Sequence, residues 1–424
     1  MPVVFFLLLF FTISAFATDV GTFWAINDIH WQWNYIVGSN EKKSCLEGVG
    51  NAGLFGQPRC SAPFTLVESA VKHMKSIQPN PDFIAYLGDL PPQEPGLKKD
   101  WNRDRLKEMS TTFTSYITEQ FSTPFVWTIG NHDVVKLNHF GKTSDYVFHD
   151  LYPLWKDHIP FDQRDNFLKG GYYRVDHSPT LSFLVLNTAY YFVTNPETVH
   201  MDDPGDQFVW IEEQIEYLKK TNRVALVFMH CPLGVTESVA TPVPNLIPKF
   251  NDKLVQVFEK GIECNVISAI FSGHEHTQAL RLVFSERLQK PGIPLFISPS
   301  LVYYSELIVV GNNPGVRLYH YNRTSGVILN YEQYFLNLTK ANSELSDHWE
   351  LEHDARELFK VSDLSANGIY QAWKNLSSDK KMLKTYIKYN TVGVPNSSYG
   401  NAALVRHLCA IRYSSFSDFV KCYV

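Results

Sequence analysis

Five apolar segments of this chain each stop at a turn that carries an Asp, Asn or His, and this arrangement strongly constrains the fold. The segments are 21–26, 83–87, 125–129, 224–229 and 266–271, and the residues that follow them are Asp28, Asp89, Asn131, His230 and His274. Short continuous apolar runs are typical of strands buried on both faces. Polar residues just beyond the carboxyl ends of such strands line one crevice. The pattern predicts an α/β fold with a sheet whose strand ends form a single site.

The turns supply side chains that can bind two adjacent metal ions. In chain order the motifs are Asp28-Ile29-His30, Gly88-Asp89, Gly130-Asn131-His132-Asp133, His230 and Gly273-His274-Glu275-His276. Each motif alone is common in structural roles, whereas all five in order at strand ends favour a functional site. Carboxylate, amide and imidazole ligands suit a site that holds a charged oxygen substrate and an activated water. A zinc finger is excluded, because no Cys pair stands at metal-binding spacing.

The N-terminal segment and four glycosylation sequons predict export from the cell. Residues 1–17 are typical of a secretory signal peptide, with an apolar run at 3–11 and an Ala15-Phe16-Ala17 cleavage site. A short membrane anchor is the alternative. Because no other stretch of about eighteen apolar residues is present, we expect no transmembrane anchor and a secreted or lysosomal protein. Four N-glycosylation sequons support this expectation, at Asn322, Asn337, Asn375 and Asn396.

The cysteines and the charge narrow the class of protein further. The spacings of two Cys pairs suit local disulfides, Cys45 with Cys60 around a Gly-rich loop and Cys409 with Cys422 around the last helical stretch. Two others, Cys231 and Cys264, are either buried thiols or a third bridge. The net charge of −5 argues against a nucleic-acid groove.

The pattern of elements changes near residue 343. Residues 18 to about 340 alternate between strand-like and helix-like segments, with amphipathic helices expected at 64–77 and 207–220 and a late strand at 327–336. Beyond that point, the spacing of Trp349, Leu351, Ala355 and Leu358 predicts a helix, followed by helices at 369–376, 382–389 and 402–411. We therefore expect a signal peptide at 1–17, a catalytic domain at 18–340 and a helical subdomain at 341–424.

The ordered motif set resembles that of the calcineurin-like metallophosphoesterases. Further segments resemble the acid sphingomyelinase-like phosphodiesterases, including Gly170-Gly171-Tyr172-Tyr173, Leu186-Asn187-Thr188 and Asn313-Pro314-Gly315-Val316-Arg317. This resemblance covers nearly all of the mature chain. It implies a four-layer αββα sandwich with a small helical C-terminal subdomain. Asp28 follows the expected signal peptide almost at once, which leaves no room for a saposin domain, so the resemblance is to the saposin-less type.

The resemblance also implies a site and a reaction. The family pattern implies one zinc on Asp28, His30, Asp89 and His276, and a second on Asp89, Asn131, His230 and His274. In such a site a metal-bridging hydroxide attacks phosphorus, Asn131 and His230 help to neutralise the phosphoryl oxygens, and His132 protonates the leaving oxygen. Asp133 either orients the turn or is a solvated carboxylate.

The implied protein is a monomeric phosphodiesterase that acts on a small phosphodiester or phosphoanhydride. Sphingomyelin-like lipid head groups, choline phosphates and nucleotides all fit as substrates, and a lipid substrate would bring peripheral membrane contact. One alternative is a nucleotide phosphohydrolase or phosphomonoesterase. Another is a secreted binding or modulator protein with weakened catalysis.

The chain departs from the family pattern at three positions. Gln93 stands where the family usually has the His of Gly-Asp-x-Pro-Pro-His, so one candidate proton donor is missing. The usual His-x-Pro-Pro-Gly segment is here His230-Cys231-Pro232-Leu233-Gly234, and 394–399 lacks a family cysteine. His139 and His149 are further candidates for the border of the cleft, and Tyr303 and Tyr304 for stacking on a base or choline group.

Overall fold

The computed structural model describes residues 19–93, 100–239, 241–303, 311–394 and 400–424. Three sequence predictions lie outside these residues: the signal peptide at 1–17, the sequon at Asn396 and the stacking role of Tyr304. Among the described residues, no helix is both long and apolar enough to cross a membrane.

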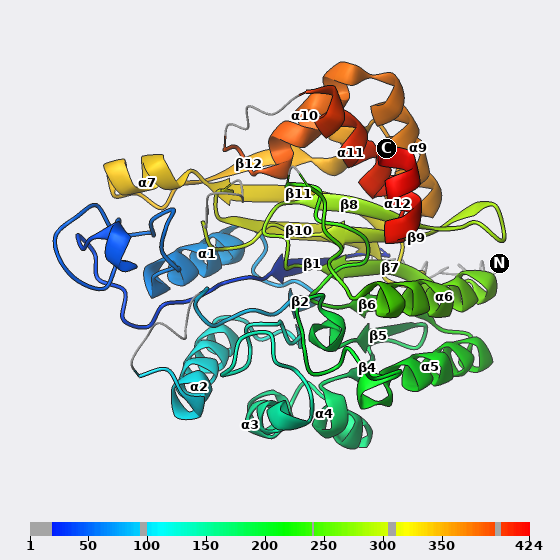
Figure 1. Ribbon diagram of the computed structural model, residues 1–424, viewed down its shortest axis with the longest axis horizontal. Helices are drawn as coiled ribbons and strands as arrows, with labels where there is room; N and C mark the ends of the chain where they lie inside the picture. The colour runs from blue at the N-terminus through cyan, green and yellow to red at the C-terminus, as the bar shows by residue number, and fades with distance from the viewer. Residues whose placement is uncertain (1–18, 94–99, 240, 304–310, 395–399) are drawn as a thin grey trace, which may run out of the picture.

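Two six-stranded sheets form the centre of the molecule (Figure 1). The first has the order β12 (Trp349–Asp354), β11 (Ile328–Leu336), β10 (Gly315–Asn322), β1 (Val20–Ile26), β2 (Phe83–Tyr86) and β3 (Phe125–Trp127). The second has the order β4 (Tyr173–Asp176), β5 (Leu181–Val185), β6 (Val224–Phe228), β7 (Ile267–Ser272), β9 (Lys290–Ile297) and β8 (Ala279–Ser285). The pairs β1–β2, β2–β3, β5–β6, β6–β7 and β7–β9 are parallel.

The two sheets pack face to face through aromatic side chains. Phe23 of β1 is fully buried, and its ring lies edge-on to Phe228 of β6 and Phe271 of β7, with ring centroids 6.3 and 5.1 Å apart. Every residue of β2 and β3 is buried. Burial on both faces explains why these strands appear in the sequence as continuous apolar runs rather than as alternating ones.

Helices cover the outer faces of both sheets. The N-terminal and middle helices are α1 (Phe64–Ile77), α2 (Arg103–Gln120), α3 (Tyr146–Trp155), α4 (Arg164–Gly170), α5 (Gln207–Thr221) and α6 (Pro248–Cys264). The indole of Trp349 in β12 donates to Ser69 of α1, which holds α1 against the first sheet. On the second sheet, α5 contacts β6, and α6 contacts β7, β8 and β9. The arrangement is the four-layer αββα sandwich.

The C-terminal part contains α7 (Leu338–Glu344), α8 (Ala355–Phe359), α9 (Ala366–Ser378), α10 (Lys380–Asn390), α11 (Asn401–Arg412) and α12 (Phe416–Tyr423). The last four of them gather at one end of the molecule, in orange to red in Figure 1, whereas α7 lies apart from them, in yellow. Of these, α9 contacts β8 and β9, and α11 contacts β8. Helices α9 and α11 therefore pack directly on the edge of the second sheet, whereas α8 contacts β11 and β12 of the first.

The structure corrects two expectations about the strands. The five apolar runs do not share one sheet, because β1, β2 and β3 belong to the first and β6 and β7 to the second. The segment from Trp349 to Asp354 is not helical but forms the edge strand β12, which pairs with β11. The backbone hydrogen bonds that β12 makes with β11 lie outside the segment itself, and such tertiary partners override a short helical spacing.

The cysteines pair locally. Disulfides join Cys45 to Cys60 and Cys409 to Cys422. The thiol of Cys231 is free and buried, whereas that of Cys264 is free and half-buried. Of the two alternatives for Cys231 and Cys264, a third bridge or free thiols, the structure therefore shows free thiols.

Candidate metal centre

Seven side chains converge where five strands end. Asp28 and His30 follow β1, Asp89 follows β2, Asn131 follows β3, His230 follows β6, and His274 and His276 follow β7. Parallel neighbours bring their carboxyl ends to the same edge of each sheet. Because the two sheets are packed together, both edges contribute to one site.

The seven residues form two groups that share Asp89. Its Oδ2 lies 3.7 Å from His30 Nε2 on one side and 3.1 Å from His230 Nε2 on the other. In the first group, Asp28 Oδ1 lies 3.7 Å from His30 Nε2 and 3.4 Å from His276 Nε2. In the second, Asn131 Oδ1 lies 3.0 Å from His230 Nε2 and 2.9 Å from His274 Nδ1. The family resemblance assigns these same residues to two metal ions.

Backbone carbonyls fix how two of the imidazoles present their nitrogens. His30 Nδ1 donates to the carbonyl of Pro91 at 2.8 Å, and His230 Nδ1 donates to that of Leu87 at 2.6 Å. A carbonyl can only accept, so Nδ1 carries a proton in both rings, and Nε2 is the nitrogen that faces the site. Such bonds orient metal-binding His residues.

Several acceptors face one another at the centre. His30 Nε2 and His276 Nε2 lie 3.1 Å apart, and the buried Asp28 Oδ1 has no hydrogen-bond partner. Within the described residues, groups of three or more His, Cys, Asp or Glu with donor atoms within 4.8 Å of one another occur only at this centre. Convergent oxygen and nitrogen acceptors in a buried site fit a pair of divalent cations.

The turns that carry these side chains are strained. The backbone has positive φ at Asp28 (47°), His30 (45°), Asp89 (66°), His274 (71°) and His276 (59°). Residues with a Cβ rarely adopt this region, and each such position costs about 1–3 kcal/mol unless the surroundings enforce it. Strain at five of the seven positions indicates that the fold maintains this geometry for a function.

Asp133 enforces part of that geometry. Its buried carboxylate accepts the backbone N–H groups of Asp89, Leu90 and Gly130 at 3.0, 3.1 and 2.7 Å. It therefore joins the turns after β2 and β3 and holds Asp89 in place. Of the two roles considered from the sequence, the structure supports the positioning role over the solvated carboxylate.

The electrostatics of the centre follow from burial and from the two acids. Burial lowers the pKa of His230, but the Asp89 and Asp28 carboxylates more than offset this and raise it to about 9. Burial would raise the pKa of Asp28 and Asp89, but the nearby imidazoles, His230 first, hold both well below the usual range. Both acids are therefore carboxylates, the form in which Asp side chains are able to bind a metal ion.

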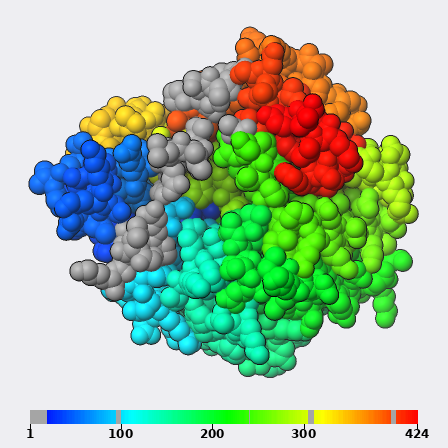
Figure 2. Space-filling view, viewed as in Figure 1, coloured from blue at the N-terminus to red at the C-terminus, as the bar shows by residue number. Residues whose placement is uncertain are grey.

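His132 and Gln93 border the same site. A hollow of about 250 Å³ is lined by Asp89, Gln93, Asn131, His132, Asn138, Phe192, Thr236, Ser238, Val239, His274, Glu275 and His276. Figure 2 shows the surface hollowed between the N-terminal segments in blue to cyan and the middle segments in green. Burial lowers the pKa of His132 to about 4, and its ring lies edge-on to His30 at 4.7 Å. Gln93 Nε2 lies 3.2 Å from His276 Nε2.

Some residues of the site were missed by sequence reasoning. Asn138 accepts a hydrogen bond from the amide of Asn131 at 2.8 Å, and the ring of Phe192 lies edge-on to His274 at 4.6 Å. Neither position carried a local signal. Neither His139 nor His149, the two candidates for the border of the cleft, lines the hollow, whereas Asn138 does. His139 Nδ1 donates to the carbonyl of Leu137, and His149 is exposed on α3. Tyr303 is half-buried against the core.

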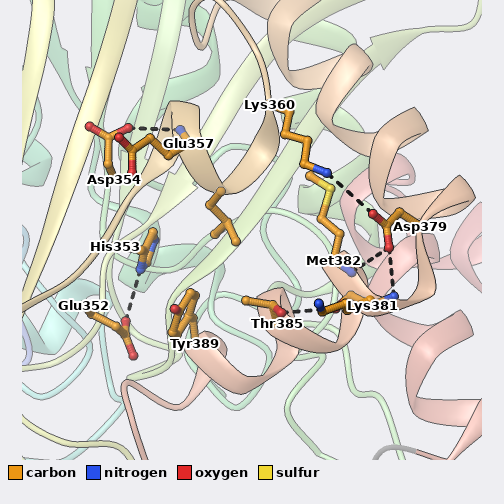
Figure 3. A pocket seen from close by; sticks show the side chains of 11 residues that line it. Glu352, His353, Asp354, Glu357, Lys360, Asp379, Lys381, Met382, Thr385 and Tyr389 are labelled. Carbon is orange, nitrogen blue, oxygen red and sulfur yellow. Dashed lines mark hydrogen bonds and ion pairs between the residues drawn. The ribbon is translucent and has the colours of Figure 1, made fainter.

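A larger hollow lies elsewhere, between β12, α8 and α10 (Figure 3). It measures about 410 Å³. Its charged residues mostly serve local structure: Asp354 and Asp379 cap the first turns of α8 and α10. The buried acid Glu352 faces His353 at 3.3 Å. No metal-type group of described residues lines it, so the strand-end centre is the candidate active site.

Comparisons with known proteins agree with this geometry. The model of the family "Calcineurin-like phosphoesterase" matches residues 21–278, and that of "Acid sphingomyelin phosphodiesterase C-terminal region" matches residues 290–424. The chain is 30% identical to acid sphingomyelinase-like phosphodiesterase 3b of Homo sapiens, over 95% of this chain and 90% of that protein.

Other relatives have related names. Sphingomyelinase phosphodiesterase C of Dictyostelium discoideum is 30% identical over 95% of this chain and 93% of its own length. A cyclic GMP-AMP phosphodiesterase of Bos taurus is 28% identical over 95% of this chain and 91% of its own length. The names thus span lipid and nucleotide phosphodiesters.

Proposed function

Because the chain belongs to the calcineurin-like phosphoesterase family, we propose that it is a secreted or lysosomal two-zinc phosphodiesterase. The observation that carries this proposal is the pair of buried donor groups that share Asp89. When bound there, two cations polarise a phosphoryl oxygen and lower the pKa of a bound water toward neutrality. Four imidazoles among the seven donors, together with carboxylates, suit zinc.

The protein's own groups complete the site. Asn131 is held by Asn138, so its carbonyl oxygen points toward His230 and His274. His132 lines the hollow beside the first group and would give a proton to the leaving oxygen at acidic pH, because its lowered pKa of about 4 leaves it largely neutral at pH 7. Gln93 can donate a hydrogen bond to a phosphoryl oxygen but cannot deliver a proton. Phe192 gives one wall of the hollow an apolar surface on which a substrate group can rest.

The substrate that we propose is a small phosphodiester or a phosphorylated lipid head group. The named relatives act on sphingomyelin-type or cyclic nucleotide phosphodiesters. A panel of sphingomyelin, CDP-choline, ATP and a chromogenic phosphodiester separates a lipid phosphodiesterase from a nucleotide hydrolase. Purified protein should contain close to two equivalents of zinc. Less than one equivalent, with no other divalent ion, would refute the proposal.

Gln93 favours one second candidate, a metal-binding protein with weak turnover. Its amide replaces a group that could act as a proton donor, and it lies within the hollow beside His276. That candidate predicts full metal occupancy and no turnover on any member of the panel. Turnover that is lost on chelation and restored by zinc excludes it.

Further parts of the proposal concern processing and organisation. We propose a monomer with a signal peptide at 1–17, a catalytic domain at 18–340 and a helical subdomain at 341–424. The two disulfides support an oxidising compartment. Mass spectrometry of secreted protein, before and after removal of N-linked sugar, checks the cleavage site and the occupancy of the sequons.

A further inference from the structure

A buried ion network lies directly behind the metal centre. Arg281 of β8 is fully buried and bridges two fully buried acids: its Nη1 lies 2.5 Å from Glu237 and its Nη2 lies 3.1 Å from Glu275. Nη2 also donates to the carbonyl of Val235 at 2.8 Å. A charge so far from water is retained only with partners of this quality, because an unpaired buried charge is strongly destabilising.

One end of the network reaches the C-terminal helices. Glu237 Oε1 accepts a hydrogen bond from His407 Nδ1 of α11 at 2.9 Å, and lies 3.3 Å from both Tyr386 Oη and Asn390 Nδ2 of α10. The backbone carbonyl of Glu237 accepts from Arg406 Nε at 2.8 Å. Two helices of the C-terminal part therefore hold a single carboxylate.

The other end reaches the turn between two of the proposed metal ligands. Glu275 lies between His274 and His276, both of which have the strained positive φ. Its Oε1 accepts from Asn245 Nδ2 at 2.8 Å as well as from Arg281. The rest of the turn is tied by two backbone amides, from His274 to Asp28 and from Ser300 to the carbonyl of His276. A strained turn persists only where several contacts enforce it, and Glu275 supplies the contacts at its centre.

We propose that Glu275 and Arg281 are positioning residues that transmit the packing of α10 and α11 to the imidazoles of His274 and His276. The helical C-terminal part thereby acts on the metal site without contacting a metal or the substrate. This inference rests on the proposed metal centre. Residues that orient metal ligands typically change metal affinity by about 10–100-fold when they are removed.

The test compares three variants of the full-length protein with wild type. Glu275→Gln keeps the size of the side chain but replaces one acceptor oxygen with an amide group, and Arg281→Lys keeps the charge but loses the two-sided contact. The matched control is Asn251→Ala. Asn251 accepts from the amide of Gly234 and donates to the carbonyl of Ser414, so it also ties this region to the C-terminal segment but does not touch the turn.

Two measurements are made on each protein. Hydrogen exchange of the amides at 273–276 is followed in metal-stripped protein, and zinc affinity is measured by competition with a chelator. We expect Glu275→Gln to speed exchange at the turn and to weaken one zinc by about 10–100-fold, and Arg281→Lys to give a smaller effect in the same direction. Asn251→Ala should lower the Tm and leave both measurements at wild-type values.

The outcomes separate the inference from the proposed function. Wild-type exchange and zinc affinity in Glu275→Gln would overturn the inference, as would an equal loss in Asn251→Ala. Wild-type protein that binds no divalent ion would instead overturn the proposed function, and the exchange rates in stripped protein would still show whether the network holds the turn. If Arg281→Lys does not fold, Glu275→Gln alone decides.

Discussion

Replacing Glu352 with Gln should stabilise the protein progressively as the pH rises from about 5 to about 8. Glu352 is at a β-bulge in the pairing of β12 with β11, and its side chain is 3% exposed. Burial raises its pKa from 4.5 to about 8, against an opposing effect of Arg317. Burial also lowers the pKa of His353 to about 3, so that this neighbour is neutral throughout the range.

The sign and size follow from proton linkage. Below pH 4.5, which is the pKa of Glu352 in the unfolded chain, the folded and the unfolded protein both keep the carboxyl proton. The stability of the folded state is therefore fully present there. As the pH rises toward the folded pKa of about 8, the unfolded chain releases a proton that the folded protein retains, so stability is lost. Each pKa unit corresponds to about 1.4 kcal/mol, which gives a loss of about 3–4 kcal/mol between about pH 5 and pH 8. Gln resembles the neutral acid and removes this dependence.

The measurement is the urea midpoint of unfolding, at constant ionic strength, for wild type and two variants. The control is Glu350→Gln in the same strand. Glu350 is 39% exposed and lies 3.6 Å from Lys340, a surface pair worth about 0–1 kcal/mol. We expect the difference between Glu352→Gln and wild type to grow with pH, and that for the control to stay small. If the three curves of stability against pH run parallel, the reasoning from burial is wrong.

Four shorter predictions concern the site and the thiols. Gln93→His should raise kcat/KM by up to about 10²–10⁴-fold on substrates with alkoxide leaving groups and little on nitrophenolates; equal or reduced rates on the alkoxide would mean that no proton donor is missing. Asp133→Asn should cost about 1–3 kcal/mol of stability and weaken zinc binding, since an amide cannot accept all three backbone N–H groups at once; unchanged zinc affinity would argue against its positioning role. A thiol reagent should label half-buried Cys264 before Cys231, whose pKa burial raises, and mass spectrometry gives the order. Chelation should lower the Tm, because bound ions stabilise only the folded state; the same Tm with and without chelator would count against a bound metal pair.

Much of the architecture could be predicted because its signals are local. The run at 83–87 predicted β2, and the amphipathic spacing at 64–77 predicted α1 with the bounds that the structure shows. The close approach of Asp28, Asp89 and Asn131 also followed from sequence, since each follows a strand that neighbours the next in one parallel set. Such predictions need only the period of the pattern and the residue that ends it.

Other features depend on partners that lie outside the segment itself. The segment 349–354 has a spacing that suits a helix, and only the free edge of β11 makes it a strand. The division of the five runs between two sheets depends on which faces pack together, and no single run specifies that.

The sequence by itself indicated the seven side chains that converge at the strand ends, because each follows a buried strand and the carboxyl ends of parallel strands meet at one edge of a sheet. Only the tertiary structure decided what holds those side chains in position. Arg281, Glu237 and His407 come from β8, a loop and α11, and each alone has the pattern of an ordinary surface residue. They become one network because burial removes water as a partner, so that each charged or polar group must find another within the fold.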